Sequence, residues 1–199
     1  MKGKRGIVEF PNRGRFKNGD VIRIDDGVWQ EKGLDGNGKR NYSIALSASI
    51  GQTKETSKTT LTTNNVDHGE MQTEVAFGFN FRWNEFGPLI SYLISKVDDE
   101  QTTTSSIGGF YRYNFKENKP GAEWVPYAGL AGSLISQDSD NTKRDGLGFR
   151  IMGGTNIFPL NDHVSLLVEG RFDYSTLKSD NTESTSTGFT LAFGISSYF

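Results

Sequence analysis

The sequence contains no cysteine, and this absence already removes several classes of protein. Without thiols the chain has no disulfide framework, no thiolate zinc site and no cysteine nucleophile. It also has no excess of basic residues, because its formal net charge is −2. A nucleic-acid-binding protein needs a basic face, so we expect no nucleic-acid partner.

Long apolar runs are missing as well. No segment approaches the roughly 18 consecutive apolar residues of a membrane-spanning helix. The first residues, MKGKRGIVEF, contain no apolar run of about 7–15 residues, so we do not expect them to form a signal peptide. Phosphate-binding loops and dinucleotide fingerprints are absent too, which argues against a nucleotide-dependent enzyme.

What the sequence does have is glycine, at 24 residues, and apolar residues at every second position. Near its end Phe189, Leu191, Phe193 and Ile195 alternate with small or polar residues, and the last residue is Phe199. A period of two is typical of β-strands. The pattern recurs in segments 42–50, 74–83, 90–94, 107–115, 123–136, 147–157, 164–174 and 188–199. It predicts eight strands of about ten residues each.

The connections between these segments alternate in character. Connections 84–88, 116–122 and 159–163 are short and contain Gly, Pro or Asn. Connections 52–72, 98–104, 137–145 and 177–187 are mostly longer and rich in Thr, Ser, Asp and Asn. Short turns at one end and long loops at the other predict an antiparallel up-and-down barrel.

Alternation alone does not tell which face of the barrel lies inside. A soluble lipocalin-like ligand carrier would hold its apolar face inward, and GVW at 27–29 is similar to the Gly-x-Trp of that family. The polar face, however, consists mainly of Gly, Ala, Ser and Asn, which suit the crowded interior of a narrow barrel. The apolar faces carry no charge, as contact with lipid requires. We therefore favour a transmembrane barrel over a soluble one.

Aromatic residues gather near the short-turn end of the predicted strands. Aromatic rings prefer the membrane–water interface, where barrels of this kind carry them as girdles. The residues are Tyr42, Phe81, Trp83, Phe86, Tyr113, Phe115, Trp124, Phe158 and Phe199.

Three segments carry a resemblance to a known family: GFTLAFGISSYF, VPYAGLAG and NIFPLNDHVSLLVEGRFDYS. They resemble the small eight-stranded outer-membrane β-barrels of Gram-negative bacteria, OmpA- and OmpX-like, over residues 41–199. The resemblance implies an outer-membrane location, periplasmic termini, extracellular long loops, and a C-terminal strand ending in Phe199 that the barrel-assembly machinery reads. We interpret residues 1–40 as a short periplasmic extension with a linker, and 41–199 as the barrel.

The residues that could carry chemistry do not form a site in the sequence. His68 in a long connection and His163 in a short one lie near opposite ends, so neither can complete a triad. The acidic residues at 98–100 and 138–140 lack the spaced ligands of a calcium loop. We therefore expect no catalytic residue, no metal and no cofactor.

Charged residues on the polar face predict a network inside the lumen. They are Glu74, Arg82, Arg112, Arg150, Glu169, Arg171 and Asp173. Buried charges must find partners or water, so the network either plugs the lumen or lines a narrow path for small ions.

The strands supply few acids in the periplasmic half, where we expect Arg82 and Arg112. The N-terminal extension offers four carboxylates, Asp20, Asp25, Asp26 and Glu31. We expect residues 1–40 to dock at the periplasmic mouth and pair with these arginines. The alternative is a free tether that binds another periplasmic protein.

Cations are predicted at the outer ends of the strands, where lipopolysaccharide presents phosphates. They are Lys54, Lys58, Lys96, Lys143, Arg144 and Lys178. Together these patterns favour a non-enzymatic outer-membrane protein with a structural, adhesion or partner-binding role. A narrow porin-like channel is the alternative.

Overall fold

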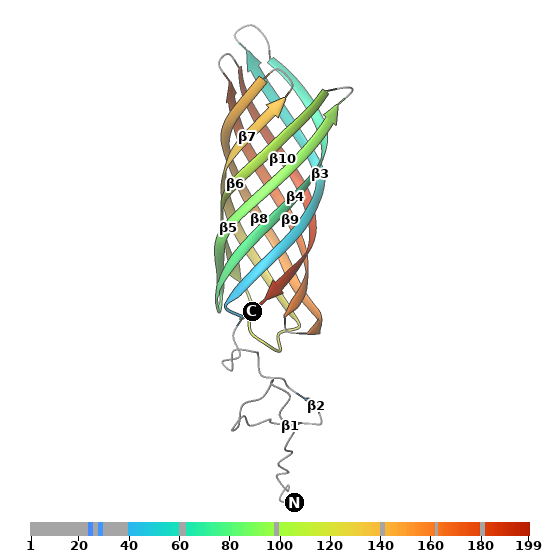
Figure 1. The fold of residues 1–199 in the computed structure, drawn as a ribbon, viewed down its shortest axis with the longest axis vertical. Coiled ribbons are helices and arrows are strands. Elements are labelled where there is room, and N and C mark those ends of the chain that lie inside the picture. The colour runs from blue at the N-terminus through green and yellow to red at the C-terminus, as the bar shows by residue number, and fades with distance from the viewer. Residues whose placement is uncertain are drawn as a thin grey trace, which may run out of the picture.

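Eight consecutive strands close into one barrel in the computed structural model (Figure 1). The structure describes residues 24–25, 28–29, 40–59, 63–97, 100–139, 142–161, 163–179 and 182–199. The barrel strands are β3 (Tyr42–Thr59), β4 (Thr63–Phe81), β5 (Asn84–Val97), β6 (Glu100–Asn114), β7 (Trp124–Ser139), β8 (Thr142–Asn161), β9 (Val164–Ser179) and β10 (Thr182–Tyr198). Each pairs with its neighbours in antiparallel fashion, and β10 pairs with β3. The predicted eight-stranded up-and-down barrel is confirmed.

Outside the barrel, β1 (Ile24–Asp25) and β2 (Val28–Trp29) form a short antiparallel pair. Apart from Arg40, the remaining residues of the predicted N-terminal extension lie outside the described part of the chain. Among the described residues there is no helix long and apolar enough to cross a membrane.

The apolar C-terminal strand is held by closure of the barrel. The Phe199 N–H donates to the Tyr42 carbonyl at 3.1 Å, and the Tyr42 N–H donates to the Phe199 carbonyl at 2.9 Å. The Asn41 N–H donates to the same carbonyl at 3.1 Å. The last residue is thus tied to the first barrel strand, and it does not end the chain as a free edge.

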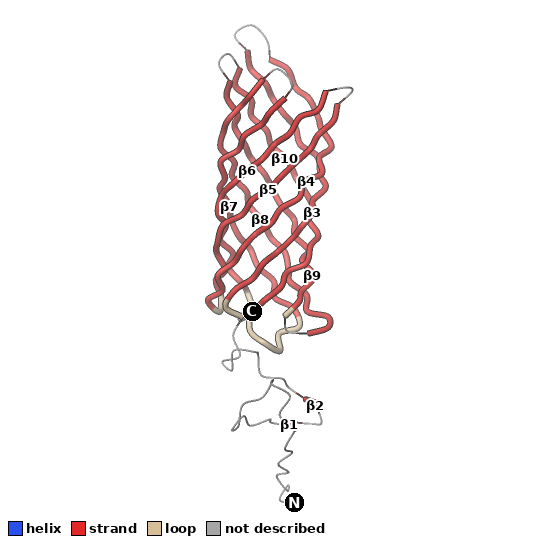
Figure 2. Tube along the Cα trace, viewed as in Figure 1, coloured by secondary structure: helices blue, strands red, loops and turns tan. Residues whose placement is uncertain are grey.

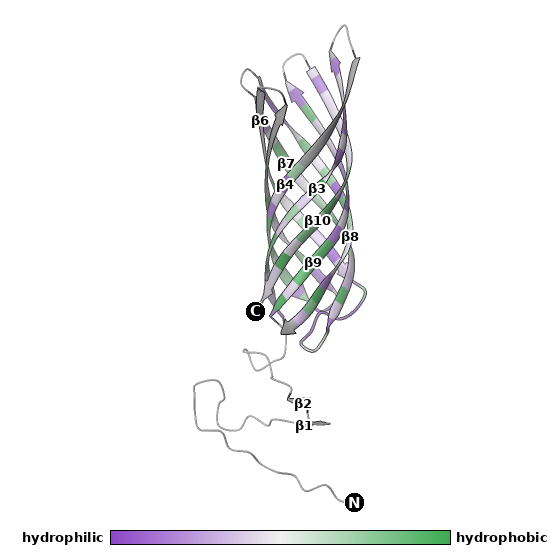
Figure 3. Ribbon diagram, turned by 90° about the vertical axis from the view of Figure 1, so that its right-hand side faces the viewer, coloured by the Kyte–Doolittle hydropathy of each residue, from purple (hydrophilic) through white to green (hydrophobic). Residues whose placement is uncertain are grey.

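The barrel is apolar outside and polar inside. In β10, Leu191, Phe193 and Ile195 are exposed, whereas Ala192 and Ser196, which point to the other face, are buried. The same alternation runs around the barrel, and in Figure 3 the hydrophobic residues are concentrated in its lower part, nearest to the C-terminus. A soluble lipocalin-like barrel would have the reverse arrangement, so this alternative is wrong.

The strands are longer than the sequence pattern predicts. They run from 14 residues in β5 to 20 in β8, whereas about 9–11 residues suffice to cross a bilayer. The predicted long loops are therefore wrong: their Thr- and Ser-rich residues continue the strands, and only residues 60–62, 98–99, 140–141 and 180–181 connect them. Polar residues can extend a ladder because hydrogen bonding between strands does not require an apolar face.

We call the strand residues that continue beyond the apolar pattern the polar extension. It comprises 52–59, 63–70, 94–97, 100–105, 136–139, 142–146, 175–179 and 182–187. With strands tilted at about 45°, the roughly four to eight residues that each strand adds beyond the apolar band raise its end by about 10–20 Å.

The opposite end carries the described turns and the C-terminus (Figure 2). The first turn is Arg82–Trp83, where Arg82 has a positive φ of 55°. The predicted connection at 84–88 is wrong, because Asn84 already begins β5. The longer connection 115–123 joins β6 to β7. We call this the turn end of the barrel.

Candidate functional site: the barrel lumen

Charged side chains fill the middle of the lumen. Because side chains alternate between the two faces of each strand, inward charges from several strands meet on the barrel axis. We call this group the lumen charge cluster; it consists of Glu74, Glu85, Arg112, Arg150, Glu169, Arg171 and Asp173. Three arginines thus face four carboxylates, so the cluster is close to neutral.

Arg171 lies at the centre of the cluster and is almost fully buried. Its Nε contacts Glu169 Oε1 at 2.5 Å, and its Nη2 contacts Glu74 Oε1 at 3.0 Å. Nη2 also donates to Ser47 Oγ at 3.2 Å. One guanidinium therefore joins β3, β4 and β9 across the lumen.

Arg150 continues the network towards the polar extension. Its Nη1 contacts the second Glu74 oxygen, Oε2, at 2.5 Å, and its Nε contacts Asp173 Oδ1 at 2.6 Å. Its Nη2 donates to Gln72 Oε1 at 3.3 Å. Glu74 is thus shared between Arg150 and Arg171, one oxygen for each.

Arg112 continues the network towards the turn end. Its Nη2 contacts Glu169 Oε2 at 3.0 Å, and its Nη1 lies 3.7 Å from Glu85 Oε2. The Tyr127 hydroxyl donates to Glu169 Oε2 at 2.6 Å, and the Tyr127 ring lies 4.7 Å from the guanidinium. Ser43 Oγ donates to Glu85 Oε1 at 2.6 Å. Arg112 needs no acid from the N-terminal extension.

The predicted docking of residues 1–40 lies outside the described residues, but two of its premises are wrong: Arg112 finds acids on the barrel strands, and Arg82 is not in the lumen. Glu85 was missed because its segment reads as a turn, although in the barrel it lies directly opposite Arg112 in the register. Arg82 does not enter the lumen: the left-handed turn directs it into solvent, where its Nε lies 3.8 Å from Glu117 Oε1. Asp20, Asp26 and Glu31 lie outside the described residues, as does the side chain of Asp25.

A second group of buried side chains lies in the lumen at the turn end. The guanidinium of Arg40 lies 3.5 Å from the centre of the Phe158 ring, and its Nη1 donates to Asn118 Oδ1 at 3.0 Å. The Phe158 ring packs against Tyr198 at 5.3 Å between ring centres, with Val125 buried beside them. We call Arg40, Asn118, Val125, Phe158 and Tyr198 the mouth plug. It brings one residue of the predicted linker into the barrel.

Phe158 was predicted as an interfacial aromatic, and this is wrong. Simple alternation from the outward-facing Ile157 places Phe158 inside, and it is buried. Trp83, Phe115, Trp124 and Phe199 are exposed at the turn end, as predicted.

Between the lumen charge cluster and the mouth plug, several polar atoms of described residues have no hydrogen-bond partner in the protein. Among the described residues, both amide atoms of Asn114 and the side-chain nitrogen of Asn156 are buried without a hydrogen bond, as is the Ser196 hydroxyl. Buried polar groups of this kind normally bind ordered water. The part of the lumen between the lumen charge cluster and the mouth plug therefore suits trapped water and does not resemble a dry core.

On the other side of the cluster lies a cavity of about 420 Å³. Arg150 and Asp173 line it near the cluster, and hydroxyls such as those of Ser91, Ser133 and Thr190 line its walls. Further out its lining includes Arg144 and Glu55, which pair at 3.3 Å. The lumen thus has a polar chamber in the outer half and the lumen charge cluster beneath it.

The predicted lipopolysaccharide contacts divide into two groups. Lys54, Lys58, Lys143 and Lys178 are exposed on the polar extension. Arg144 instead turns into the lumen, where it pairs with Glu55 and donates to Ser184 Oγ at 3.2 Å, so its prediction is wrong. The side chain of Lys96 lies outside the described part.

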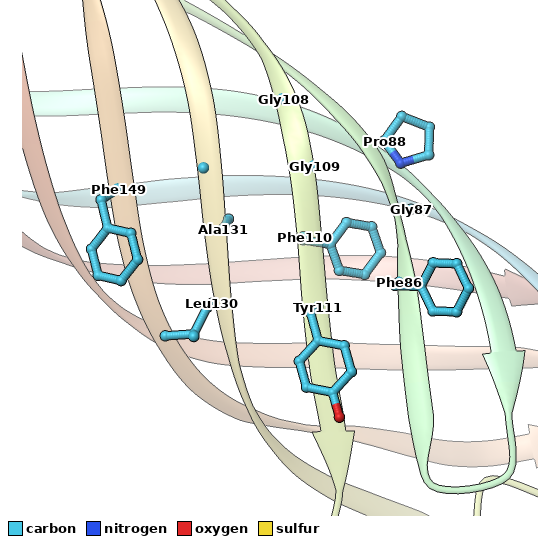
Figure 4. A pocket seen from close by; sticks show the side chains of 11 residues that line it. Phe86, Gly87, Pro88, Gly108, Gly109, Phe110, Tyr111, Leu130, Ala131 and Phe149 are labelled. Atoms are coloured by element: carbon cyan, nitrogen blue, oxygen red, sulfur yellow. The ribbon is translucent and has the colours of Figure 1, made fainter.

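The outer surface also carries a shallow depression of about 600 Å³ (Figure 4). Its floor includes Gly109 and Gly132, which are direct partners in the register, and its edges include Phe86, Leu130 and Phe149. Apart from the Tyr111 hydroxyl its side chains are apolar, so the depression offers little to a polar ligand.

No group of three or more His, Cys, Asp or Glu side chains within the described residues is placed to hold a metal. His163 lies in the turn between β8 and β9, as predicted, with Nδ1 3.1 Å from the Tyr198 carbonyl. His68 belongs to β4 and not to a loop.

Comparison with known proteins supports the fold. No family model and no curated protein matches the sequence. Among solved structures the chain is similar to Neisserial surface protein A, with a TM-score of 0.55 and 17% identity over 80% of this chain and 97% of that one. It also matches the outer membrane enzyme PagL (TM-score 0.44, 13% identity, 74% and 97% covered). A third match is Ail of Yersinia pestis in complex with the heparin analogue sucrose octasulfate (TM-score 0.38, 12% identity, 76% and 98% covered).

At such low identity these similarities show the fold and nothing further. The chain has the fold of the small eight-stranded outer-membrane barrels, as the resemblance in the sequence predicts.

Proposed function

We propose that the protein is a non-enzymatic outer-membrane barrel with a sealed lumen, and that it acts through the surface of its polar extension. The apolar outer face supports a membrane location, because exposed residues such as Leu46, Ile90 and Phe193 would be costly in water. The turn end then faces the periplasm with both termini, and the polar extension faces the outside of the cell.

The observation that carries this proposal is the lumen charge cluster. Arg112, Arg150 and Arg171 each contact at least two acidic side chains, and these pairs cross the lumen from several strands. Displacing one of these arginines would leave buried carboxylates without partners, at a cost of several kcal/mol. This cost supports a lumen through which hydrated ions do not pass.

The outer surface supports two partners. Exposed Lys54, Lys58, Lys143 and Lys178 suit the phosphates of lipopolysaccharide, although Lys178 also lies 3.4 Å from Glu183. The apolar terminal strand that ends in Phe199 suits recognition by the barrel-assembly machinery. Residues 1–39 act as a tether for a periplasmic partner, because Arg112 already has its own carboxylates.

A narrow channel is the second candidate function. It is favoured by the 420 Å³ chamber above the cluster and by the unpaired polar atoms below it, which together provide wet space on both sides. The two candidate functions differ in whether ions can pass the lumen charge cluster from one space to the other.

Single-channel recording in planar bilayers tests the choice. The sealed barrel predicts no steady conductance from the full chain. A Glu74→Ala, Arg150→Ala, Arg171→Ala variant serves as the control, because removing these side chains opens the lumen. Steady openings of the unmodified chain at the nanosiemens level would overturn the proposal in favour of the channel.

A further inference from the structure

The outer half of the lumen contains the cavity of about 420 Å³, which we call the outer chamber. Its lower end is marked by a change in exposure within the lumen charge cluster. The side chains of Glu74 and Glu169 are 5% and 0% exposed, whereas that of Asp173 is 32% exposed. Asp173 lines the chamber, so its exposed surface faces this space. Room for a dissolved molecule thus begins at Asp173, above the packed part of the cluster.

The walls of the outer chamber consist largely of hydroxyl and amide groups. Ten of its lining residues are serine or threonine, and two are glutamine. They come from strands around the whole barrel, from Thr53 on β3 to Thr190 on β10. A hydroxyl both donates and accepts hydrogen bonds, and an amide side chain does the same. Such walls suit a ligand that itself carries hydroxyls on several sides, because each hydrogen bond can then form in either direction.

The charged groups of the outer chamber are already paired. Arg150 contacts Asp173 at 2.6 Å and also pairs with Glu74. Further out, Arg144 contacts Glu55 at 3.3 Å. Two arginines and two carboxylates line the chamber, so its net charge is close to zero. A charged or zwitterionic ligand would have to compete with one of these pairs, which is costly where the partners are partly buried. A neutral ligand leaves the pairs in place.

Asp173 still has hydrogen-bonding capacity at the floor of the chamber. Its Oδ1 accepts from Arg150 Nε at 2.6 Å, and its Oδ2 accepts from Thr190 Oγ1 at 3.3 Å. A carboxylate has about four lone-pair sites, and these two bonds between described side chains occupy two of them. A ligand hydroxyl can therefore donate to Asp173 without displacing Arg150. Hydrogen bonds to a charged acceptor are stronger than neutral ones.

Apolar side chains interrupt the polar walls. They are Leu89, Leu93, Ile135 and Leu177. A sugar ring has the same division, because its hydroxyls project from the rim while its C–H groups form apolar patches on the two faces. A hydrocarbon in the chamber would leave the wall hydroxyls and amides without partners, at a cost for each group. The mixed lining therefore fits a sugar better than it fits an apolar ligand.

We propose that the outer chamber binds a neutral saccharide from outside the cell. At about 30 Å³ of liquid volume for each water, the chamber has room for about 14 waters, which about one or two sugar rings would replace. Small-molecule sites typically measure about 300–1,000 Å³. This inference goes beyond the proposed function, because neither the sealed lumen nor the surface of the polar extension requires an occupant in the chamber.

Saturation-transfer NMR on the full-length protein in lipid nanodiscs provides the test. The neutral probes are D-glucose, D-galactose, D-mannose and N-acetyl-D-glucosamine, each at about 10 mM, which suffices to detect a Kd of about 1 mM. D-glucuronate and D-galacturonate are the charged controls, because they have the same rings with a carboxylate added. We expect at least one neutral sugar to bind, and both uronates to bind at least about tenfold more weakly than that sugar.

The methyl glycoside of the sugar that binds identifies the source of the ligand. Retained binding supports a site for the end of a longer saccharide, because the glycosidic position then tolerates a substituent. Loss of binding supports a site for a free sugar.

The variant Ser133→Ala with Thr190→Val removes two wall hydroxyls and keeps every charge of the lumen charge cluster. Thr176→Val is the matched control, because Thr176 faces outward on β9 between Tyr174 and Lys178. Loss of two hydrogen bonds to a neutral ligand should weaken binding about tenfold, whereas Thr176→Val should change it less than about twofold.

Three results would overturn the inference. One is no saturation transfer to any of the four neutral sugars. Another is equally tight binding of a uronate, which would indicate recognition of charge. The third is a response to Ser133→Ala with Thr190→Val that is no larger than the response to Thr176→Val, which would place the sugar outside the chamber. Each can occur while the barrel remains non-conducting, so failure of the sugar site is distinguishable from failure of the sealed lumen.

Discussion

Glu74 and Arg150 are joined across the barrel lumen by an Oε2–Nη1 contact of 2.5 Å, although 76 positions separate them in the chain. The other oxygen of Glu74 contacts Arg171. Glu74 is thus the carboxylate that links the outer part of the lumen charge cluster to its centre, and its loss leaves two buried arginines short of one partner each.

The variant Glu74→Gln should therefore destabilise the barrel strongly. Breaking a buried ion pair by removing one partner costs about 3–5 kcal/mol, because the remaining charge stays buried. Urea unfolding in lipid vesicles, followed by tryptophan fluorescence, measures the loss. The control Glu183→Gln removes an exposed pair with Lys178 and should cost less than about 1 kcal/mol. Equal effects of the two variants would contradict the role of Glu74.

Arg40 should stabilise the turn end although it precedes the first barrel strand. Arg40→Ala removes a buried stacking contact with Phe158 and the hydrogen bond to Asn118, which together are worth about 2–3 kcal/mol. Deletion of residues 1–39 retains Arg40 and should leave the unfolding free energy nearly unchanged. The exposed Arg82→Ala serves as a second control. If the deletion destabilises the barrel as much as Arg40→Ala, the extension docks at the mouth and is not a tether.

The outer face should respond to charge according to its depth in the membrane. Leu46 faces outward in the middle of the apolar part of β3, so Leu46→Arg should cost about 2–4 kcal/mol in lipid. Gln52 faces outward in the polar extension, and Gln52→Arg should cost about 0–1 kcal/mol. The same urea titration measures both. Similar costs at the two positions would place the membrane boundary elsewhere.

The lysines of the polar extension should bind lipopolysaccharide, whereas Arg144 should not. Lys54 and Lys58 are exposed on β3, but Arg144 is engaged inside the lumen with Glu55. We expect Lys54→Gln with Lys58→Gln to reduce lipopolysaccharide co-purifying with the barrel, and Arg144→Gln to leave it unchanged. Quantification of the bound phosphate checks this expectation. A loss confined to Arg144→Gln would reverse the assignment.

The barrel could be predicted from the sequence because its two faces differ along every strand. Alternation in β10, from Phe189 to Ile195, distinguishes outward-facing from lumen-facing residues even when the strands that pair with β10 are not known. It also predicts an inward position for Arg150, Glu169 and Arg171. Which arginine meets which acid could not be predicted, because this depends on the register of several strands at once.

The errors arise where the two-residue period carries no information. In the Thr- and Ser-rich segments both faces are polar, so their sequence does not distinguish a strand from a loop. Around Arg82 the turn position was misplaced by a few residues, which brought Arg82 into the predicted lumen and left Glu85 out of it. Arg40 belongs to no periodic segment, so no local signal indicated that it would enter the barrel.

The absence of cysteine permits a direct test of the sealed lumen. Single cysteines are introduced above the cluster, as Ser133→Cys in the wall of the outer chamber, and below it, as Ser196→Cys near the turn end. A membrane-impermeant cationic thiosulfonate reagent is then added to the polar-extension side of oriented proteoliposomes. The sealed barrel predicts that Ser133→Cys reacts and that Ser196→Cys does not. Reaction of Ser196→Cys from that side at a rate similar to that of Ser133→Cys would show an open path through the cluster and contradict the account.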